Sequence, residues 1–268
     1  MITEDFSEIN GEGTILRKTQ LRVLDMLIIV DKICRKHAID YWLIGGSLLG
    51  AVRHGGYIPW DDDIDISIQY KDLKKLRKIL LKELPKRYVI QDYLSDKNYY
   101  LDSVFKIRDT KSQFYVEHYR SFKEQGIVLD IVPMEKIPSM KFKRFIFRLN
   151  KHPYLRRKEL SLTGKSNNIK GLLLKPFAAM AIKFAHWYSN ISTTKMYGYN
   201  YIFWLGRCFE LHFHKSVLFP LKEMEFEGNS FFVPNNVDQL LKITYGDYMK
   251  IPPKENRQVH ATHIEIYE

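Results

Sequence analysis

Apolar residues recur every three or four positions in two stretches of the N-terminal half, and this spacing predicts two amphipathic helices. The first covers residues 14–36, with Thr14 suited to cap its N-terminus. The second covers residues 71–84 and stops at Pro85. The apolar stripe of each helix is expected to pack on a core, and its charged residues are expected to face water.

Elsewhere the pattern changes to short apolar runs, or to alternation of apolar and polar residues, and both predict strands. The predicted strands cover residues 41–44, 63–66, 88–91, 103–108 and 126–133. A hairpin is predicted over 217–232, with its turn near Gly228, followed by a helix that Gly246 ends. These elements predict an α/β (α+β) fold, in which helices flank a small mixed sheet.

A glycine-rich turn follows the first predicted strand. Gly45 and Gly46 precede Ser47, a residue type that favours the N-cap of the predicted helix 48–54, and Gly55 suits its C-terminus. Backbone N–H groups at such a turn, together with a helix N-terminus, favour an anion. We therefore expect Gly46 and Ser47 to bind phosphate.

The run Asp61-Asp62-Asp63-Ile64-Asp65 leads into the second predicted strand. Side chains two apart on a strand share a face and lie about 6.6 Å apart along it, so Asp63 and Asp65 should point the same way and Asp62 away from them. Carboxylates placed so close favour a hard divalent cation such as Mg²⁺. The alternative is a solvated acidic turn, but the glycines before the acids and the alternating isoleucines favour a metal site.

Asp130 is the one acid in the apolar strand predicted over 126–133. An unpaired carboxylate in an apolar strand would be costly to bury. Shared coordination of a metal with Asp63 and Asp65 would remove that cost, so we predict these three aspartates as metal ligands and catalytic residues. The alternative is a structural aspartate with its own hydrogen-bond partners.

Basic residues near the predicted site could neutralise phosphate charge. In the strand predicted over 103–108, Val104, Lys106 and Arg108 should share a face. Lys106 and Arg108 could then stabilise negative charge in a transition state, and the alternative is ordinary surface charge. Arg53 is placed among the phosphate-binding candidates by its location alone.

The stretch GGSLLGAVRHGGYIPWDDDIDI resembles the LicD family, and FVPN…YGDY…PP, followed by Arg257 and His260, is a second stretch similar to that family. The resemblance covers about residues 20–135 and 217–260. It implies a nucleotidyltransferase-like core with a third carboxylate on a neighbouring strand, where Asp130 stands.

The resemblance also implies a reaction. Members of the family transfer a phosphorylated alcohol, best known as phosphocholine from CDP-choline, to a hydroxyl of a cell-surface glycan and release CMP. The expected cofactor is Mg²⁺, with Mn²⁺ as an alternative. The expected partners are CDP-choline or a related CDP-alcohol, and a lipid-linked glycan or teichoic acid precursor.

Positive charge is concentrated in the middle of the chain. The net charge is +11, and residues 136–190 contain thirteen Lys or Arg residues and one acid, Glu159, which gives this segment alone +12. Two helical stripes, one starting at Phe142 and one at Phe177, flank a loop predicted over 164–171, with Pro176 in the first turn of the second helix. Basic amphipathic helices favour a membrane surface, whereas the alternative is packing on the core. We see no nucleic-acid-binding motif and expect no nucleic acid partner.

The sequence predicts three parts: a catalytic core over 1–135, a basic helical insertion over 136–215, and a C-terminal part over 216–268 that completes the core. Residues 196–214 are rich in aromatics and are interpreted as helical core.

Cys34 and Cys208 are the only cysteines, which excludes a disulfide framework and a Cys-based zinc site and favours a reducing compartment. The acidic N-terminus does not resemble a signal peptide, and no apolar run reaches the roughly 20 residues of a membrane span. We expect a cytoplasmic protein at the inner face of the cell membrane.

Two other functions use the same features. A nucleotidyltransferase that modifies a small molecule or RNA would use the same carboxylates but leave the nucleoside monophosphate on its product. A non-catalytic protein that binds a membrane or an anionic polymer would rely on the basic segment alone.

Overall fold

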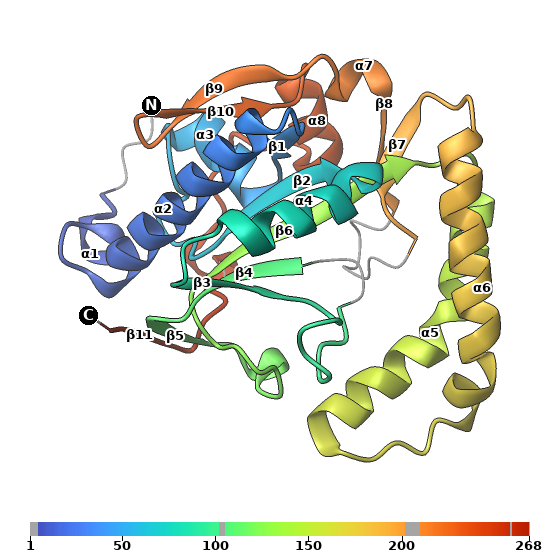
Figure 1. The fold of residues 1–268 in the computed structure, drawn as a ribbon. Helices are drawn as coiled ribbons and strands as arrows, with labels where there is room; N and C mark the ends of the chain where they lie inside the picture. The colour runs from blue at the N-terminus through green and yellow to red at the C-terminus, as the bar shows by residue number, and fades with distance from the viewer. Residues whose placement is uncertain (1–4, 102–104, 202–209, 258, 268) are drawn as a thin grey trace.

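The computed structural model describes residues 5–101, 105–201, 210–257 and 259–267 (Figure 1). The first half contains the helices and strands α1 (Ser7–Asn10), α2 (Ile15–Lys36), β1 (Tyr41–Leu43), α3 (Gly45–His54), β2 (Ile64–Gln69), α4 (Tyr70–Glu83), β3 (Tyr88–Gln91), β4 (Phe105–Asp109), β5 (Ser112–Tyr115) and β6 (Val128–Lys136). The second half contains α5 (Met140–Thr163), α6 (Ile169–Ile191), β7 (Met196–Tyr199), β8 (His212–His214), α7 (Lys215–Leu218), β9 (Lys222–Phe226), β10 (Asn229–Val233), α8 (Val237–Tyr245) and β11 (His263–Ile266).

Within the described residues, seven strands form one mixed sheet. Its main order is β1-β2-β6-β4-β3, and β7 pairs with the end of β6 and carries β8. The pair β2–β6 is parallel, whereas the other pairs of this sheet are antiparallel. The predicted α/β class with a mixed sheet and flanking helices is therefore confirmed.

The core lies between this sheet and the helices predicted from periodicity. Val23, Leu27 and Val30 of α2 are fully buried, as are Leu76 and Leu80 of α4. Burial of such stripes is the main source of stability for amphipathic helices. The Thr14 hydroxyl accepts a hydrogen bond from the N–H of Arg17, which confirms the predicted cap of α2.

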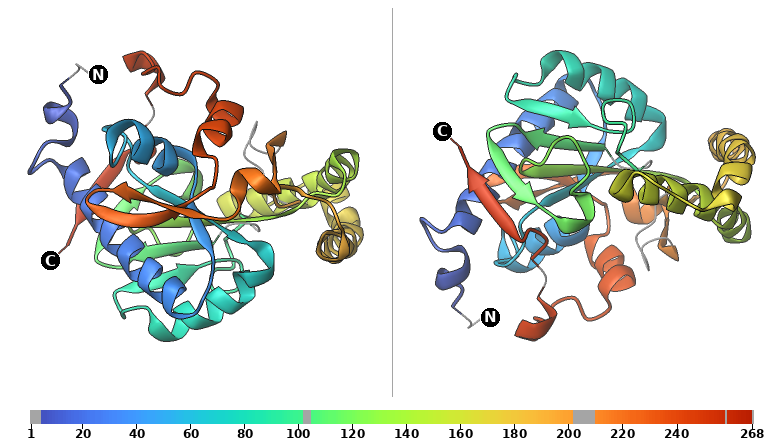
Figure 2. Two further views of the ribbon diagram at one scale, coloured as in Figure 1. Left: turned by 90° about the horizontal axis from the view of Figure 1, so that it is seen from above. Right: turned by 90° about the horizontal axis from the view of Figure 1, so that it is seen from below.

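Helices α5 and α6 form a separate arm, which projects beyond one end of the sheet (Figure 2). The arm has its own small apolar cluster, in which Ile146 of α5 and Ala185 of α6 are buried together with Ile137 and Tyr201. Near its far end, the Ser161 hydroxyl donates to the carbonyl of Asn98, which ties α5 to the core.

Two predictions in this half of the chain are wrong. Helix α6 begins at Ile169, so Pro176 lies inside the helix rather than in its first turn, because the Asn168 side chain caps the helix earlier by accepting from the N–H of Gly171. Residues 196–199 and 212–214 are strands rather than helix, which agrees with the strand preference of aromatic residues. The strands β7 and β8 show that residues 136–215 also contribute to the sheet, while the proposed division into three parts stays a prediction.

The C-terminal part packs on the core, and its hairpin begins later than the predicted residue 217, because residues 215–218 form α7. Strands β9 and β10 form the hairpin, α8 follows, and Gly246 stands at its C-cap. Strand β11 pairs with β5 in a separate two-stranded sheet. No helix in the described parts of the chain is both long and apolar enough to cross a membrane.

Candidate functional site

Three charged residues stand side by side across the centre of the sheet. Asp65 of β2 is in register with Asp130 of β6, and Lys106 of β4 is in register with the same Asp130. Directly paired residues on neighbouring strands point to the same face. The sequence predicted each of these residues separately, and the strand order places them in one row.

Lys106 and Asp130 form an ion pair that is largely shielded from water. The Lys106 ammonium lies 2.6 and 2.5 Å from the two carboxylate oxygens of Asp130, and the lysine is only 3% exposed. The ammonium also lies 5.1 Å from the centre of the Tyr119 ring. Asp130 therefore has a cationic partner within the protein itself, and its predicted role as a metal ligand stays a prediction.

The two predicted arginines make other contacts. Arg108 is buried and donates to the Gln91 side chain and to the carbonyl of Gly126, so it braces the strands next to the charged row. Burial lowers the pKa of its guanidinium. Arg53, in the last turn of α3, donates to the carbonyl of Tyr248 and ties this helix to the C-terminal segment. Their predicted phosphate contacts are not tested by these positions.

The glycine-rich turn brings the start of α3 against the carboxylates. Helix α3 begins at Gly45, so Ser47 lies in its first turn. The prediction that Ser47 is the N-cap is therefore wrong. The Ser47 hydroxyl instead accepts a hydrogen bond of 2.9 Å from the N–H of Asp65. A Cβ atom at Gly46 would lie 2.3 Å from an oxygen of Asp61, so only glycine permits this approach. The turn thus holds the backbone of Asp65 and leaves room for the side chain of Asp61.

A second group of acids lies just before β2. Asp61, Asp62, Asp63 and His260 each offer one potential ligand atom, and these four atoms lie within 4.8 Å of one another. Asp62 was predicted to point away from Asp63, and this is wrong. Residues 61–63 precede the strand, so the alternation of strand side chains does not apply to them.

His260 is the functional candidate that sequence reasoning missed. Its ring Nδ1 lies 2.8 Å from Asp62, its backbone N–H and that of Ala261 also donate to Asp62, and Asp63 lies 3.7 Å away. The hydrogen bond to Asp62 raises the pKa of His260 to about 10. The stretch containing His260 resembled the LicD family, but no local pattern could show its contact with residues 198 positions earlier.

Burial and mutual repulsion raise the pKa values of the acids. The pKa of Asp63 is raised to about 6, mainly by burial and further by Asp130 and Asp62. The pKa values of Asp61 and Asp65 lie well above the usual range, because both carboxyl groups are largely desolvated and both are repelled by Asp63. A divalent cation would remove this repulsion, and oxygen donors are the ligands that Mg²⁺ prefers. The donor set therefore fits the predicted metal.

An aromatic cluster links this site to the helical arm. Tyr99, Tyr100 and Phe122 are buried together, and Tyr119 stacks on Phe122 while its ring faces Lys106. Tyr154 of α5 packs edge-on against Tyr100. The arm therefore contacts the residues next to the charged row.

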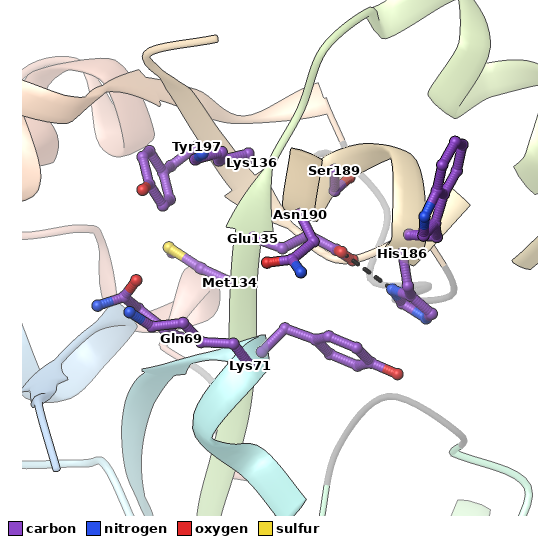
Figure 3. Close-up of a pocket in the computed structure, with 11 residues that line it drawn as sticks. Gln69, Lys71, Met134, Glu135, Lys136, His186, Ser189, Asn190 and Tyr197 are labelled. Carbon is purple, nitrogen blue, oxygen red and sulfur yellow. Dashed lines mark hydrogen bonds and ion pairs between the residues drawn. The ribbon is translucent and has the colours of Figure 1, made fainter. Parts of the chain in front are cut away.

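A separate pocket of about 390 Å³ lies between the end of β6 and α6 (Figure 3). His186 of α6 lies 2.9 Å from the Glu135 carboxylate and stacks on Tyr70 with ring centres 3.9 Å apart. Glu135 stands five residues beyond Asp130 along β6, or about 16 Å. The pocket is thus distinct from the group of aspartates.

Comparison with known proteins agrees with this arrangement. Residues 38–159 match the family described as LicD/FKTN/FKRP, nucleotidyltransferase domain. The chain is 28% identical to the lipopolysaccharide cholinephosphotransferase LicD of Haemophilus influenzae over 266 residues, which cover 93% of this chain and 96% of that protein. Shorter stretches match an uncharacterized protein of Rickettsia prowazekii, with 43% identity over 24% of each chain, and human ribitol 5-phosphate transferase FKRP, with 60% identity over 13% of this chain and 7% of that protein.

The glycine-rich turn and the carboxylates of β2 and β6 lie within residues 38–159, the segment that matches this nucleotidyltransferase domain. The match over residues 38–159 and the similarity to a LicD protein along most of the chain confirm the resemblance to the LicD family that the sequence had predicted.

Proposed function

We propose that this protein is a metal-dependent transferase that moves a phosphorylated alcohol from a CDP carrier to a hydroxyl of a cell-surface glycan or teichoic acid precursor and releases CMP. The proposed group is phosphocholine, and the proposed donor is CDP-choline. The observation that carries the proposal is the row of Asp65, Asp130 and Lys106 next to the glycine-rich start of α3. This row lies inside the segment that matches the LicD family.

The proposed donor follows from the relatives. The Haemophilus influenzae relative, which the alignment covers almost end to end, is a cholinephosphotransferase, and the locally similar human relative transfers ribitol 5-phosphate. Both names describe transfer of a phosphorylated alcohol, so this reaction class is favoured and choline is the first alcohol to test.

The residues take complementary parts in the proposed reaction. Asp63, Asp65 and Asp130 would hold Mg²⁺ or Mn²⁺, with Asp61 and His260 adjacent. When bound, such an ion neutralises charge on a diphosphate and polarises its phosphorus–oxygen bonds. The backbone N–H groups at Gly46 and Ser47 suit the phosphates, and the Lys106 ammonium suits charge that develops during transfer.

The transfer itself exchanges one phosphorus–oxygen bond for another. The acceptor hydroxyl oxygen bonds to the phosphorus that carries the alcohol, and the bond from that phosphorus to the bridging oxygen breaks. CMP leaves with the bridging oxygen and its electron pair. Asp130 accepts the proton of the acceptor hydroxyl, and Lys106 holds this carboxylate in place.

Product analysis tests the reaction. Purified protein is incubated with CDP-choline and Mg²⁺, with and without a teichoic acid precursor, and we expect acceptor-dependent CMP and a phosphocholine-modified acceptor. Turnover of a different CDP-alcohol would keep the reaction class and replace choline. A nucleotidylated acceptor would establish the nucleotidyltransferase alternative instead, and no turnover of any nucleotide donor would reject the enzyme.

The raised pKa values predict how metal-free stability depends on pH. The folded state binds the Asp63 proton more tightly than the unfolded state, so stability falls as pH rises from 3.8 to about 6. The raised pKa of His260 stabilises the fold fully below 6.5, and this contribution is lost as pH rises to about 10. Both effects lower the melting temperature as pH increases.

Mg²⁺ should reverse the part of this trend that comes from the acids. Thermal unfolding in EDTA and in Mg²⁺ at matched ionic strength should show a larger stabilisation by Mg²⁺ at about pH 8 than at about pH 5, because ligand carboxylates must be ionised. Equal melting temperatures with and without Mg²⁺ at about pH 8 would remove the support for a metal at these residues.

The proposed acceptor also suggests a location. A lipid-linked precursor would be met at the inner face of the cell membrane, and residues 136–190 stay the predicted membrane-facing segment. The location rests on the charge and apolar pattern of this segment.

A further inference from the structure

Helix α6 exposes a continuous stripe of large apolar side chains on its outer face. Eight of them are between 51 and 68% exposed, and we call them the α6 stripe: Ile169, Leu172, Leu173, Phe177, Met180, Phe184, Trp187 and Ile191. Their spacing of three and four residues places them on one side of the helix over its whole length. Figure 1 shows α6 along the outer edge of the arm.

The opposite face of α6 explains why this stripe points outward. The buried residues of the helix are small: Gly171, Ala178, Ala185 and Ser189. A Cβ atom at Gly171 would lie 2.5 Å from the carbonyl oxygen of His152 in α5, so the two helices approach closely along this small face. A helix that packs on a core normally buries its largest apolar residues, and α6 does the reverse.

The charges around the stripe indicate what covers it. Residues 136–190 carry +12, and the sequence of α6 contains no acid. Lys170 and Lys183 are exposed and lie at the two sides of the stripe, where their ammonium groups can reach a headgroup layer while their carbon chains stay apolar. An apolar face flanked by basic residues is typical of a helix that lies in a membrane interface and binds anionic lipid.

We propose that α6 lies flat in the interface of a membrane that contains anionic lipid, with the α6 stripe inserted between the headgroups. A second copy of this chain is a poorer occupant, because two segments of +12 would face each other and like charges oppose association. The arm would then hold the group of aspartates at the membrane surface. Tyr154 of the arm contacts Tyr100 of the aromatic cluster, which lies next to the charged row.

Vesicle binding tests this inference with the full chain and without nucleotide or metal, so the result does not depend on the proposed reaction. We expect the protein to co-sediment with vesicles of phosphatidylcholine and phosphatidylglycerol, and to bind vesicles of phosphatidylcholine alone at least about tenfold more weakly. In a Trp204→Phe background, the fluorescence of Trp187 should shift to shorter wavelength on binding, and adding Trp187→Phe should remove this shift, since the two remaining tryptophans, Trp42 and Trp60, are buried.

The decisive variant combines Leu173→Gln, Phe177→Gln and Met180→Gln, which should weaken binding to the anionic vesicles at least about tenfold. The matched control is Leu81→Gln, a change at an equally exposed leucine of α4, 59% exposed, which should bind like the wild type. Lys170→Glu with Lys183→Glu should weaken binding to anionic vesicles only, and this variant tests the inference even if the triple variant fails to fold.

Three results would overturn the inference. Unchanged binding of a correctly folded triple variant would show that the stripe does not contact lipid. Equal binding to both vesicle types would remove the role of anionic lipid. A wild-type dimer in sedimentation that the triple variant converts to a monomer, without vesicle binding by either, would assign the stripe to a second copy.

Discussion

Asp65→Asn should lower CMP release by about 10³-fold or more, and the same change should leave the melting temperature of the metal-free protein unchanged or higher. The first effect is expected because Asp65 lies in the charged row, and an amide in its place keeps an oxygen but supplies no negative charge to bind Mg²⁺. The second is expected because burial and the facing Asp63 hold the pKa of Asp65 well above its usual range. A neutral side chain of the same shape removes that repulsion.

The two effects are measured separately, by CMP release with saturating donor and by thermal unfolding in EDTA. The backbone N–H of Asp65 bonds to Ser47 and is kept in the variant, so the turn should stay in place. Asp40→Asn, at an exposed aspartate just before β1, is the matched control and should change neither quantity. Full activity of Asp65→Asn would exclude this carboxylate from catalysis, and a large loss of melting temperature would give it a structural role.

The sequence predicts those parts of the site that depend on local pattern. The spacing of apolar residues gave α2 and α4, and a single acid in an apolar strand pointed to Asp130. Lys106 was predicted as a basic residue near the acids. Its ion pair with Asp130 depends on β4 lying next to β6, and strand order is set by the packing of the whole sheet rather than by either strand alone.

The predictions that failed concern residues whose positions depend on long-range contacts or on irregular backbone. Residues 61–63 precede the strand, so the expected alternation did not place Asp62, and His260 reaches it from the far end of the chain. For α6, residues of both faces are apolar, and periodicity could not tell that the small residues would be buried and the large ones exposed. The strands β7 and β8 form by pairing with the end of β6, which the local sequence does not show.

Lys106→Met should lower the free energy of unfolding by about 3–5 kcal/mol in EDTA, because it leaves Asp130, whose side chain is only 15% exposed, without its cationic partner. Methionine has nearly the length and shape of lysine, so the loss reports charge more than packing. Denaturant unfolding at neutral pH measures it. The second change Asp130→Asn, added to Lys106→Met, should restore most of the stability because no unpaired charge is then left.

The same variant connects stability to the proposed chemistry. A divalent cation next to Asp130 would replace the charge that Lys106 supplies, so Mg²⁺ should stabilise Lys106→Met more than it stabilises the wild type. The double variant serves as the control and should gain less from Mg²⁺, because it has lost one predicted ligand. Asp130→Asn alone completes the comparison: if its effect and that of Lys106→Met simply add in the double variant, Lys106 and Asp130 are not coupled. If Mg²⁺ stabilises all three proteins equally, Asp130 is not among the metal ligands, and the site must then be built from Asp61, Asp63, Asp65 and His260.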